Sequence, residues 1–476
     1  MFHVTMVTLI GGDRRTTQRR GATMSGIPRR ALRAGGVVAA AALVLTGCLQ
    51  NPNASGGSGG AGGAGGGFAD GGSADGDKVV TILGAFGGDE EKNFNASLAE
   101  FEKASGIDIK YTSDQDFTTT IKQKVSSGDS PDIGLFPQPG GMIEMAAQGK
   151  VQPIDTYLDY DKLQGTLLPG FLDAGRYKGR VYGAPMRNAV KSIVWYPKAA
   201  YEKGGYNQSP DTIQQLRTDV ADKIAATGIT PWCIGWESDQ ATGWVGTDWV
   251  EELMLRMYGP TVYDDWTSHR MPFNDPKVVK ALDEAAKFNK DPNMVLGGTK
   301  GVLNTAFGDA MTPAFANPPK CMLHRQGNFA TTFYPKNVQA DLDNQVGIYV
   351  FPKFAGGYDG QAILGGGDLA ALFNGNDPDA QKVMAFLTSD KFGGPWAKAG
   401  GWLSPHKTFD LSNYPNETTK KIALIANKAS VLRFDGSDLM PKSIGSDVFW
   451  KEMVKWENGQ SSQQTADNIE AAWPKS

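Results

Sequence analysis

Cysteine and histidine, the side chains that most often act as nucleophiles or zinc ligands, are rare in this chain of 476 residues, which holds three cysteines and four histidines. The histidines form neither an HExxH motif nor a close His–His pair, which are the patterns that bind catalytic zinc. They are His3, His269, His324 and His406. We therefore expect no metal, no cofactor and no zinc-dependent hydrolysis.

A glycine run before Asp368 resembles the glycine-rich loops that bind phosphate. Residues 365–368 read GGGD, and glycine-rich loops expose backbone N–H groups that can bind phosphate. However, the Gly-Lys-Ser/Thr sequence of a phosphate-binding loop does not follow. The run stands directly before an apolar stretch that ends at Phe373, so we predict a turn there and no phosphate site.

The thiol of Cys48 follows a basic segment and a short apolar run. Three arginines within 29–33 precede the run 35–45, which is shorter than the roughly 20 residues that span a bilayer. The ending Leu45-Thr46-Gly47-Cys48 resembles a bacterial lipobox, in which the thiol is lipidated and cleavage leaves the cysteine first. Gly47 and the glycines beyond it argue against the alternative, a cysteine buried in a hydrophobic helix.

The sequence therefore predicts an exported protein held on the outer face of the cytoplasmic membrane by a lipid. We expect a lipoprotein signal peptide over 1–47, which starts at Met1 or at Met24. The lipidated Cys48 would begin a flexible glycine-rich tether over 48–77.

Two further cysteines, Cys233 and Cys321, lie in the exported part of the chain. An even pair in an oxidising compartment favours a disulfide between them. Two separate buried thiols are the alternative.

Charge and length limit the class of protein. Residues 1–47 hold seven arginines and one aspartate, so residues 48–476 keep 40 basic and 50 acidic side chains and a net charge of −10. No basic stripe remains to bind phosphates, so nucleic acid is not expected as a partner. The roughly 400 residues beyond Asp77 exceed one comfortable hydrophobic core and predict two lobes.

The first part of this body alternates between strand and helix patterns. Such alternation with short connections predicts a parallel sheet covered by helices, with ligands beyond the carboxyl ends of its strands. Strands are predicted over 79–83, 107–112 and 131–136, and helices over 94–104, 117–127 and 142–147. Further helices are predicted over 278–288 and 380–387.

Several segments resemble the extracellular solute-binding proteins of ABC sugar importers, the class of maltose-binding protein. They are EFEKASGIDIKY (100–111), SSGDSPDIGLF (126–136), AAQGKVQPID (146–155) and YKGRVYGAP (177–185). Others resemble the branch that serves α-glucosides and related oligosaccharides, namely PWCIG (231–235), ATGWVGTDW (241–249), CMLHRQGNF (321–329) and RFDGSDLMP (433–441). The resemblance extends from about residue 79 to residue 473.

The resemblance implies an α/β fold of two lobes, each a mainly parallel sheet flanked by helices. Hinge strands would join the lobes, and a ligand cleft would lie between them. The first lobe is expected over 78–187 and 352–405, and the second lobe over 188–351 and 406–476.

A sugar requires flat apolar surface for its C–H faces and polar groups for its hydroxyls. Trp244 and Asp248 would supply both, and the glycines around them predict a loop rather than a regular helix. Core packing of Trp244, or capping of the following helix by Asp248, is the alternative. The family's stacking aromatics match Phe136, after the PDI strand, and Trp450, in MPKSIGSDVFW.

The glycine run would let backbone amides at Gly367 approach a hydroxylated ligand, with Asp368 as an acceptor. A tight turn in which Asp368 caps a helix is the alternative. The remaining polar candidates either contact the ligand or brace the hinge by ion pairing. They are Arg325, Gln326, Arg433, Asp435 and Asp438.

The resemblance implies a monomeric receptor, not an enzyme, that captures an oligosaccharide of α-glucoside type and delivers it to the permease subunits of an ABC importer. The alternative is a secreted, lipid-anchored glycoside hydrolase, which would need two carboxyl groups about 5–10 Å apart. With 51 Asp and Glu residues in the chain, sequence spacing leaves that alternative open.

Overall fold

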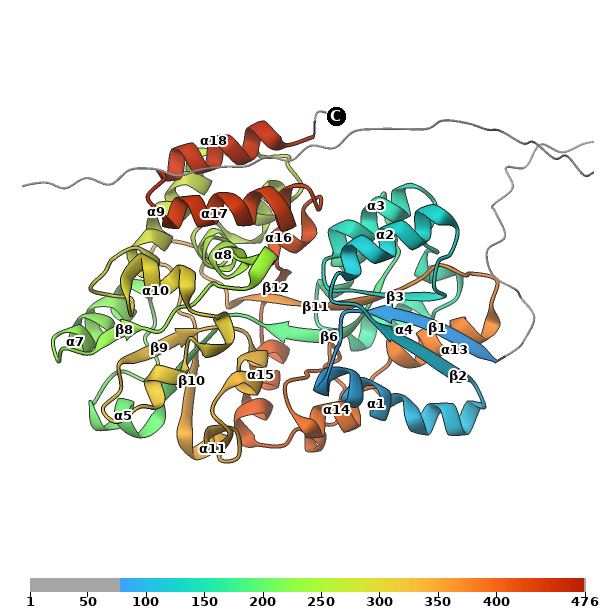
Figure 1. Ribbon diagram of the computed structural model, residues 1–476, viewed down its shortest axis with the longest axis horizontal. Coiled ribbons are helices and arrows are strands. Elements are labelled where there is room, and N and C mark those ends of the chain that lie inside the picture. Colours follow the sequence, from blue (N-terminus) through green and yellow to red (C-terminus); the bar gives the residue numbers. More distant parts are fainter. Residues whose placement is uncertain (1–77, 475–476) are drawn as a thin grey trace, which may run out of the picture. The chain divides into compact units, whose positions relative to one another are not determined.

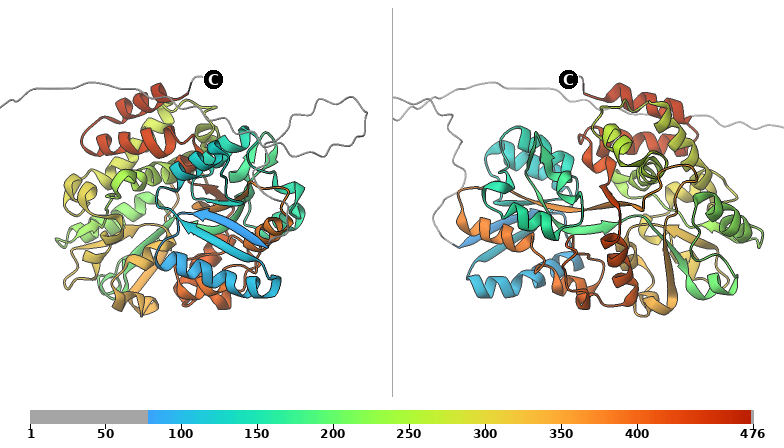
Figure 2. Two further views of the ribbon diagram at one scale, coloured as in Figure 1. Left: turned by 45° about the vertical axis from the view of Figure 1, so that its right-hand side comes forward. Right: turned by 180° about the vertical axis from the view of Figure 1, so that it is seen from behind.

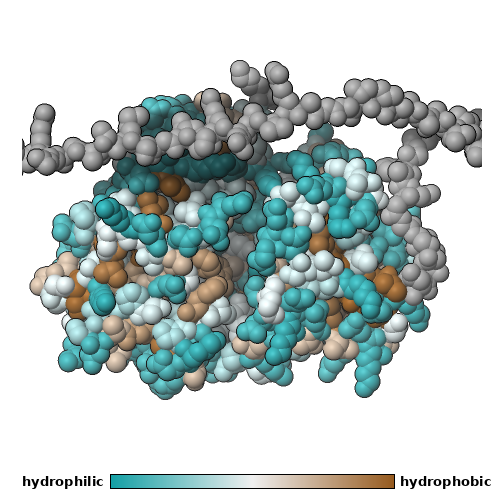
Figure 3. All heavy atoms as spheres, in the orientation of Figure 1, coloured by the Kyte–Doolittle hydropathy of each residue, from teal (hydrophilic) through white to brown (hydrophobic). Residues whose placement is uncertain are grey.

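A computed structural model describes residues 78–474, which belong to one compact unit. The predicted signal peptide, Cys48 and the predicted tether lie outside these residues. Within the described part of the chain, no helix is both long and apolar enough to cross a bilayer. Figure 3 shows a face on which hydrophilic residues predominate and apolar ones are scattered.

The larger sheet has six strands, in the order β12–β11–β3–β1–β2, with β6 also paired to β11 (Figure 1). β1 is parallel to β2 and β3, whereas β11 is antiparallel to β3 and β6 and parallel to β12. The predicted parallel sheet is therefore confirmed for the first three strands. The strands are β1 (Val79–Gly84), β2 (Asp108–Ser113), β3 (Ile133–Phe136), β6 (Ala184–Val190), β11 (Ala362–Leu372) and β12 (Val431–Phe434).

Helices cover both faces of this sheet, with α2 and α3 on one side and α1 and α14 on the other (Figures 1 and 2). α1 buries Phe94 and Leu98, and its C-cap residue is Gly106, which takes the left-handed conformation that favours glycine. The helices are α1 (Asp89–Ser105), α2 (Phe117–Ser127), α3 (Pro139–Ala147), α4 (Tyr160–Thr166), α13 (Pro378–Leu387) and α14 (Gly394–Ala399). These helices and the strands β1, β2 and β3 lie within 78–187 and 352–405, the ranges predicted for the first lobe, whereas β12 lies within 406–476, predicted for the second.

The glycine run lies inside β11, so both the turn and the helix cap predicted there are wrong. Gly367 has a φ of 141°, and a Cβ added to it would lie 2.0 Å from the carbonyl oxygen of Arg187 on β6. The pairing register shifts immediately afterwards, between Asp368 and Leu369. Glycine is thus required because two backbones approach closely within the sheet.

The second lobe is built on a four-stranded sheet with the order β10–β7–β9–β8. Two of its three pairings are antiparallel, so the expectation of a mainly parallel sheet fails in this lobe. The reason is connectivity: β7 enters this lobe directly after β6 and β10 leaves it ahead of β11, so these neighbours run in opposite directions. The strands are β7 (Ile193–Pro197), β8 (Thr230–Trp232), β9 (Cys321–Arg325) and β10 (Val346–Val350). A separate hairpin pairs β4 (Arg176–Tyr177) with β5 (Arg180–Val181).

Helices surround the second sheet, and β6 crosses between the two lobes (Figure 1). The predicted helix over 278–288 is confirmed as α9. The helices are α5 (Lys198–Lys203), α6 (Ile213–Gln215), α7 (Asp222–Ala225), α8 (Trp244–Thr267), α9 (Pro276–Asn289), α10 (Gly298–Asn304), α11 (Lys336–Gln339), α12 (Leu342–Gln345), α15 (Glu417–Asn427), α16 (Gly436–Leu439), α17 (Trp450–Glu457) and α18 (Ser462–Ala472). The predicted lobe boundary at 187/188 falls within β6, and the exact boundaries stay predictions.

Helix α8 begins at Trp244, so the loop predicted for this segment is wrong. Gly243 is the N-cap residue, and Asp248 lies within the helix rather than capping it. Glycine is needed at position 246 because a Cβ there would lie only 2.5 Å from the indole ring of Trp236. Packing against a neighbouring ring, rather than a break in the helix, explains this glycine.

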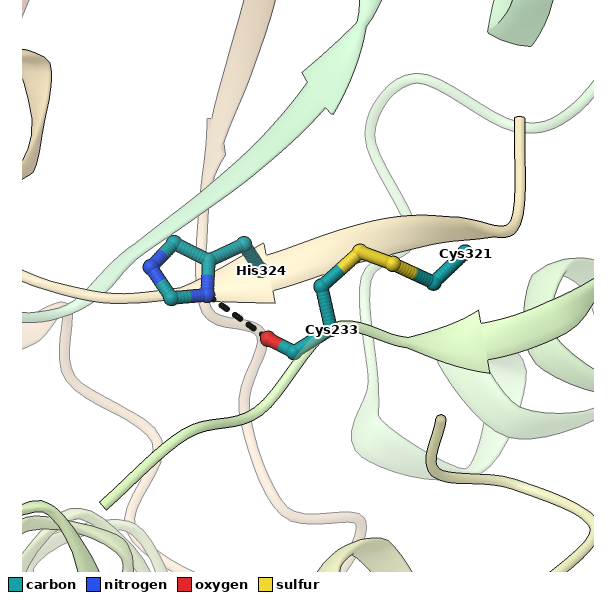
Figure 4. Close-up of a disulfide and its surroundings, with 3 residues drawn as sticks. All are labelled: Cys233, Cys321 and His324. Atoms are coloured by element: carbon teal, nitrogen blue, oxygen red, sulfur yellow. Dashed lines mark hydrogen bonds between the residues drawn. A yellow bond between two sulfur atoms is a disulfide. The ribbon is translucent and has the colours of Figure 1, made fainter. Parts of the chain in front are cut away.

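The predicted disulfide between Cys233 and Cys321 is confirmed (Figure 4). It joins the segment after β8 to the first residue of β9, with Cα atoms 5.4 Å apart and 88 positions apart in sequence. Nδ1 of His324 donates a hydrogen bond of 2.7 Å to the carbonyl oxygen of Cys233, and burial lowers the pKa of this imidazole to about 4. The closed loop is long enough for chain entropy to contribute about 4–5 kcal/mol.

Candidate functional site

A cavity of about 300 Å³ lies where β6 and β11 meet segments of both lobes. Its wall combines aromatic rings, amides, one hydroxyl and charged groups. The residues that form it are Pro137, Gln138, Arg187, Asn188, Ala189, Lys191, Ala241, Trp244, Asn328, Phe329, Gly366, Gly367, Gly401, Asp435, Ser437, Asp438 and Trp450. This volume is at the lower end of the range for small-molecule sites.

Two tryptophans line the cavity, one at the start of α8 and one at the start of α17. Gly243, which precedes Trp244, lets the two backbones approach closely. Its φ is 119°, and a Cβ added to it would lie 2.2 Å from the carbonyl oxygen of Trp450. Nε1 of Trp244 donates to the hydroxyl of Ser238 at 3.0 Å, whereas Nε1 of Trp450 is buried without a partner in the described residues. A close backbone contact thus places two aromatic rings at one site.

The ammonium of Lys191 lies in the cavity wall and joins three segments of the chain. Its Nζ atom is 2.9 Å from Asp248 on α8 and 2.5 Å from Asp435, the N-cap residue of α16. It also lies 5.1 Å from the centre of the Trp244 ring. Lys191 follows β6 directly, so this cluster ties the crossing strand to two elements beside it.

The charged state of this cluster follows from its contacts. Burial opposes the charge on Lys191, but Asp248 and Asp435 outweigh it and raise the pKa of the ammonium. Burial would also raise the pKa of Asp435, but Lys191 and its hydrogen bonds lower it to about 2. For Asp248, burial prevails over Lys191 and raises the pKa to about 7. Lys191 and Asp435 are therefore a charged pair.

Asp248, Glu251 and Asp435 also have the geometry of a cation site, with carboxylate oxygens all within 4.8 Å of one another. Their hydrogen-bond partners are internal. Lys191 contacts two of them, and Glu251 accepts from the backbone N–H groups of Gly436 and Ser437 at 2.9 and 3.0 Å. The cation of this cluster is the lysine itself.

A second charged group, Arg187 on β6, lies in the same wall. It donates to Asp368 through Nε at 2.5 Å and to Glu90 through Nη1 at 2.7 Å. Its guanidinium carbon lies 4.7 Å from the ring centre of Phe86 and 5.5 Å from that of Trp396. Arg187 therefore joins β6, β11 and α1, and the ring contacts hold its plane in place.

Five of the residues predicted from sequence lie in the cavity wall: Trp244, Gly367, Asp435, Asp438 and Trp450. The other six lie outside it. Phe136 is buried and packs edge-on against Phe117. Asp368 pairs with Arg187, and Asp248 with Lys191. The remaining three are Arg325, which pairs with Glu252; Gln326, which accepts from the N–H of Gly327; and Arg433, which pairs with Asp264.

Sequence reasoning missed the contribution of β6, which supplies Arg187 and Asn188, with Lys191 just after it. It also missed Gln138 and Phe329. The signal for β6 was present, since two cations in a run of otherwise small and apolar residues need buried partners. Nothing in their spacing says where those partners lie.

The family follows from comparison with known proteins. A family model described as bacterial extracellular solute-binding protein matches residues 87–393. This chain is a bacterial extracellular solute-binding protein. The family predicted from the sequence is thereby confirmed.

Two named relatives cover most of this solute-binding protein. It is 41% identical over 398 residues to the osmoprotective compounds-binding protein GgtB of Synechocystis sp., which covers 84% of this chain and 93% of the relative. It is 35% identical over 410 residues to the alpha-glucosides-binding periplasmic protein AglE of Rhizobium meliloti, with coverage of 83% and 87%.

Solved structures support the two-lobed fold. The bacterial solute receptor AcbH matches with a TM-score of 0.66 at 18% identity, over 84% of this chain and 97% of that one. Maltose-bound MalE3 of T. maritima matches with a TM-score of 0.61 at 17% identity, over 83% and 98%. The predicted fold class is confirmed, with the change in strand direction described above.

Replacing Lys191 with methionine should destabilise the solute-binding protein strongly. Asp248 and Asp435 would then lie buried without their ammonium, which typically costs about 3–5 kcal/mol of unfolding free energy. Urea denaturation of the purified protein measures this loss. Lys451→Met is the matched control, because Lys451 pairs with Asp447 at the surface and such pairs contribute about 1 kcal/mol or less. Similar, small losses in both variants would contradict the importance given to Lys191.

Proposed function

We propose that this protein is the carbohydrate receptor of an ABC importer. It captures an oligosaccharide of α-glucoside type in the cavity and delivers it to the permease subunits in the membrane. The observation that carries the proposal is that Trp244 and Trp450 line the same cavity, in a wall that also holds amides, carboxylates and one hydroxyl. The Rhizobium relative is named for binding alpha-glucosides, and this supports a ligand of that type.

The cavity suits a sugar because a sugar has both apolar and polar faces. Indole rings pack against C–H faces, and polar groups in the wall bind hydroxyls. Two buried polar atoms in this wall have no partner among the described residues: the Nε1 donor of Trp450 and the Oδ1 acceptor of Asn188.

The charges of the cavity favour a receptor over a glycoside hydrolase. Hydrolysis requires two carboxyl groups that are free to exchange protons or to attack the sugar. Here Asp435 is bound by Lys191, and the carboxylate of Asp368 by Arg187. Asp438 is left as one carboxyl group without a bound cation. We therefore propose that the protein binds its sugar without turnover, and release of glucose from maltose by the purified protein would contradict this.

Binding should draw the two lobes together, since a ligand that touches both is held best when they close. We propose the boundaries 78–187 with 352–405 and 188–351 with 406–476 for these lobes, and a monomeric receptor. β6 and β11 would carry the movement, and both contribute to the cavity wall.

The lipid anchor is part of the proposal. Lipidation of Cys48, after removal of 1–47, would hold the receptor near its permease on the outer face of the cytoplasmic membrane, with 48–77 as the tether. Mass spectrometry of the mature N-terminus should find diacylglycerol on Cys48, and Cys48→Ala should remain uncleaved by the lipoprotein pathway. A mature protein without lipid would contradict the anchor.

Trp450→Ala should weaken sugar binding about tenfold or more while leaving the melting temperature nearly unchanged. The aromatic contact contributes about 0.5–1.5 kcal/mol beyond buried area, and the ring lies half-buried at the cavity. Calorimetric titration with maltose, trehalose and sucrose, beside a melting curve, measures both effects.

The matched control is Trp456→Ala, six residues further along α17. Trp456 is only 1% exposed, so its truncation should cost about 3–5 kcal/mol of stability. If Trp450→Ala behaved like this control and kept its affinity, Trp450 would be a core residue and the proposed platform would be wrong.

A further inference from the structure

The two indoles of the cavity wall are held in different ways. Nε1 of Trp244 donates a hydrogen bond to the hydroxyl of Ser238 at 3.0 Å. Nε1 of Trp450 is buried and has no partner among the described residues. Of the two rings, Trp244 is therefore the one with a polar anchor.

The hydroxyl of Ser238 is a junction between Trp244 and the segment that holds Phe307. It accepts from the indole and donates to the carbonyl oxygen of Glu237 at 2.7 Å. The same carbonyl oxygen accepts from the backbone N–H of Phe307 at 3.1 Å. The rings of Trp244 and Phe307 also meet edge to face, with their centres 5.3 Å apart. Trp244 is thus tied to this segment twice, through Ser238 and through its own ring.

Ser238 itself lies in a short loop that is fixed by hydrogen bonds. Its backbone N–H donates to Oγ1 of Thr242 at 3.0 Å, and that hydroxyl donates to the carbonyl oxygen of Asp239 at 2.7 Å. Asp239 has a φ of 49°, a left-handed conformation that a residue other than glycine keeps only where the surrounding structure imposes it. The loop therefore holds the Ser238 hydroxyl in a defined place beside the indole.

We propose that Ser238 is a positioning residue, which holds the Trp244 ring in its place in the cavity wall before a ligand arrives. The proposal rests on the carbohydrate-binding function proposed above and adds the residue that orients one of its two aromatic surfaces. A ring that is already ordered loses little rotamer freedom on binding, so more of the contact energy appears as affinity. Without the Ser238 hydroxyl, the indole N–H would lack its acceptor and the ring would turn to find another.

A spectroscopic test of this role needs no ligand. The chain has 11 tryptophans, so the protein is labelled with 5-fluorotryptophan, and the fluorine NMR signal of Trp244 is identified as the one absent from Trp244→Phe. The parent protein should give one narrow signal for Trp244, and Ser238→Ala should broaden or split it. A signal that is equally narrow in both proteins, or already broad in the parent, would overturn the role of Ser238.

Ser462→Ala is the matched control, because it removes the same kind of hydrogen bond from a tryptophan of the core. The hydroxyl of Ser462 accepts from Nε1 of Trp456 at 3.1 Å, and Trp456 is 1% exposed and lies outside the cavity wall. This variant should leave the Trp244 signal and the sugar affinity as in the parent protein.

Calorimetric titration with the tightest-binding of maltose, trehalose and sucrose gives the second readout. Ser238→Ala should weaken binding about fivefold, because the ligand must then order the ring. Ser238→Thr keeps a hydroxyl at this position and should restore both the affinity and the narrow signal. Equal affinities in Ser238→Ala and the parent would overturn the proposal. If no sugar bound to the parent, the proposed function would fall, while the fluorine signal would still decide whether Ser238 positions Trp244.

A second variant keeps the test decisive if Ser238→Ala does not fold. Thr242→Val removes the hydroxyl that fixes the loop and leaves Ser238 and Trp244 themselves in place. It should broaden the Trp244 signal and weaken sugar binding about twofold to threefold. An unchanged signal in this variant would overturn the proposal.

Discussion

The buried ammonium of Lys191 is the interaction on which the rest of the site depends. It binds Asp248 on α8 and Asp435 at the start of α16, and it follows β6 without an intervening loop. The Lys191 ammonium therefore holds together three segments that are distant in sequence. Removing either carboxylate from water is costly, so the arrangement is stable only while all three groups remain together. The cavity wall takes its shape from this constraint.

The same constraint explains how a polar cavity can be ready for an uncharged ligand. Because Arg187 and Lys191 are already matched by carboxylates, the fixed charges need no rearrangement when water leaves. Trp244 lies beside Lys191, and the backbone of Gly243 brings Trp450 to the same place. The ligand then supplies what the wall lacks, namely apolar C–H groups for the rings and hydroxyls for the polar side chains of the wall.

Local patterns predicted part of the first lobe, since α1, α2 and the first three strands follow the apolar spacing of their own residues, whereas β6 and β11 were not recognised as strands. Chain length and the resemblance both predicted two lobes, the needs of a sugar ligand pointed to Trp244, and the resemblance supplied Trp450. The failures have one physical cause. Gly246 and Gly367 read as breaks in the sequence, but each makes room for a partner from elsewhere, the ring of Trp236 and the backbone of β6. Long-range contacts of this kind also decide which charges meet, so Lys191 could not be assigned to the cavity from its neighbours in sequence.

The central claim is that an uncharged sugar binds between Trp244 and Trp450, against Asn188 and Asp438. A crystal structure of the protein with the tightest-binding of maltose, trehalose and sucrose tests it most directly. The account predicts a sugar ring in van der Waals contact with both indoles, with hydroxyls within hydrogen-bond distance of the two polar side chains, and with the contacts of Lys191 unchanged. A sugar bound elsewhere, or one that separates Lys191 from Asp435, would contradict it.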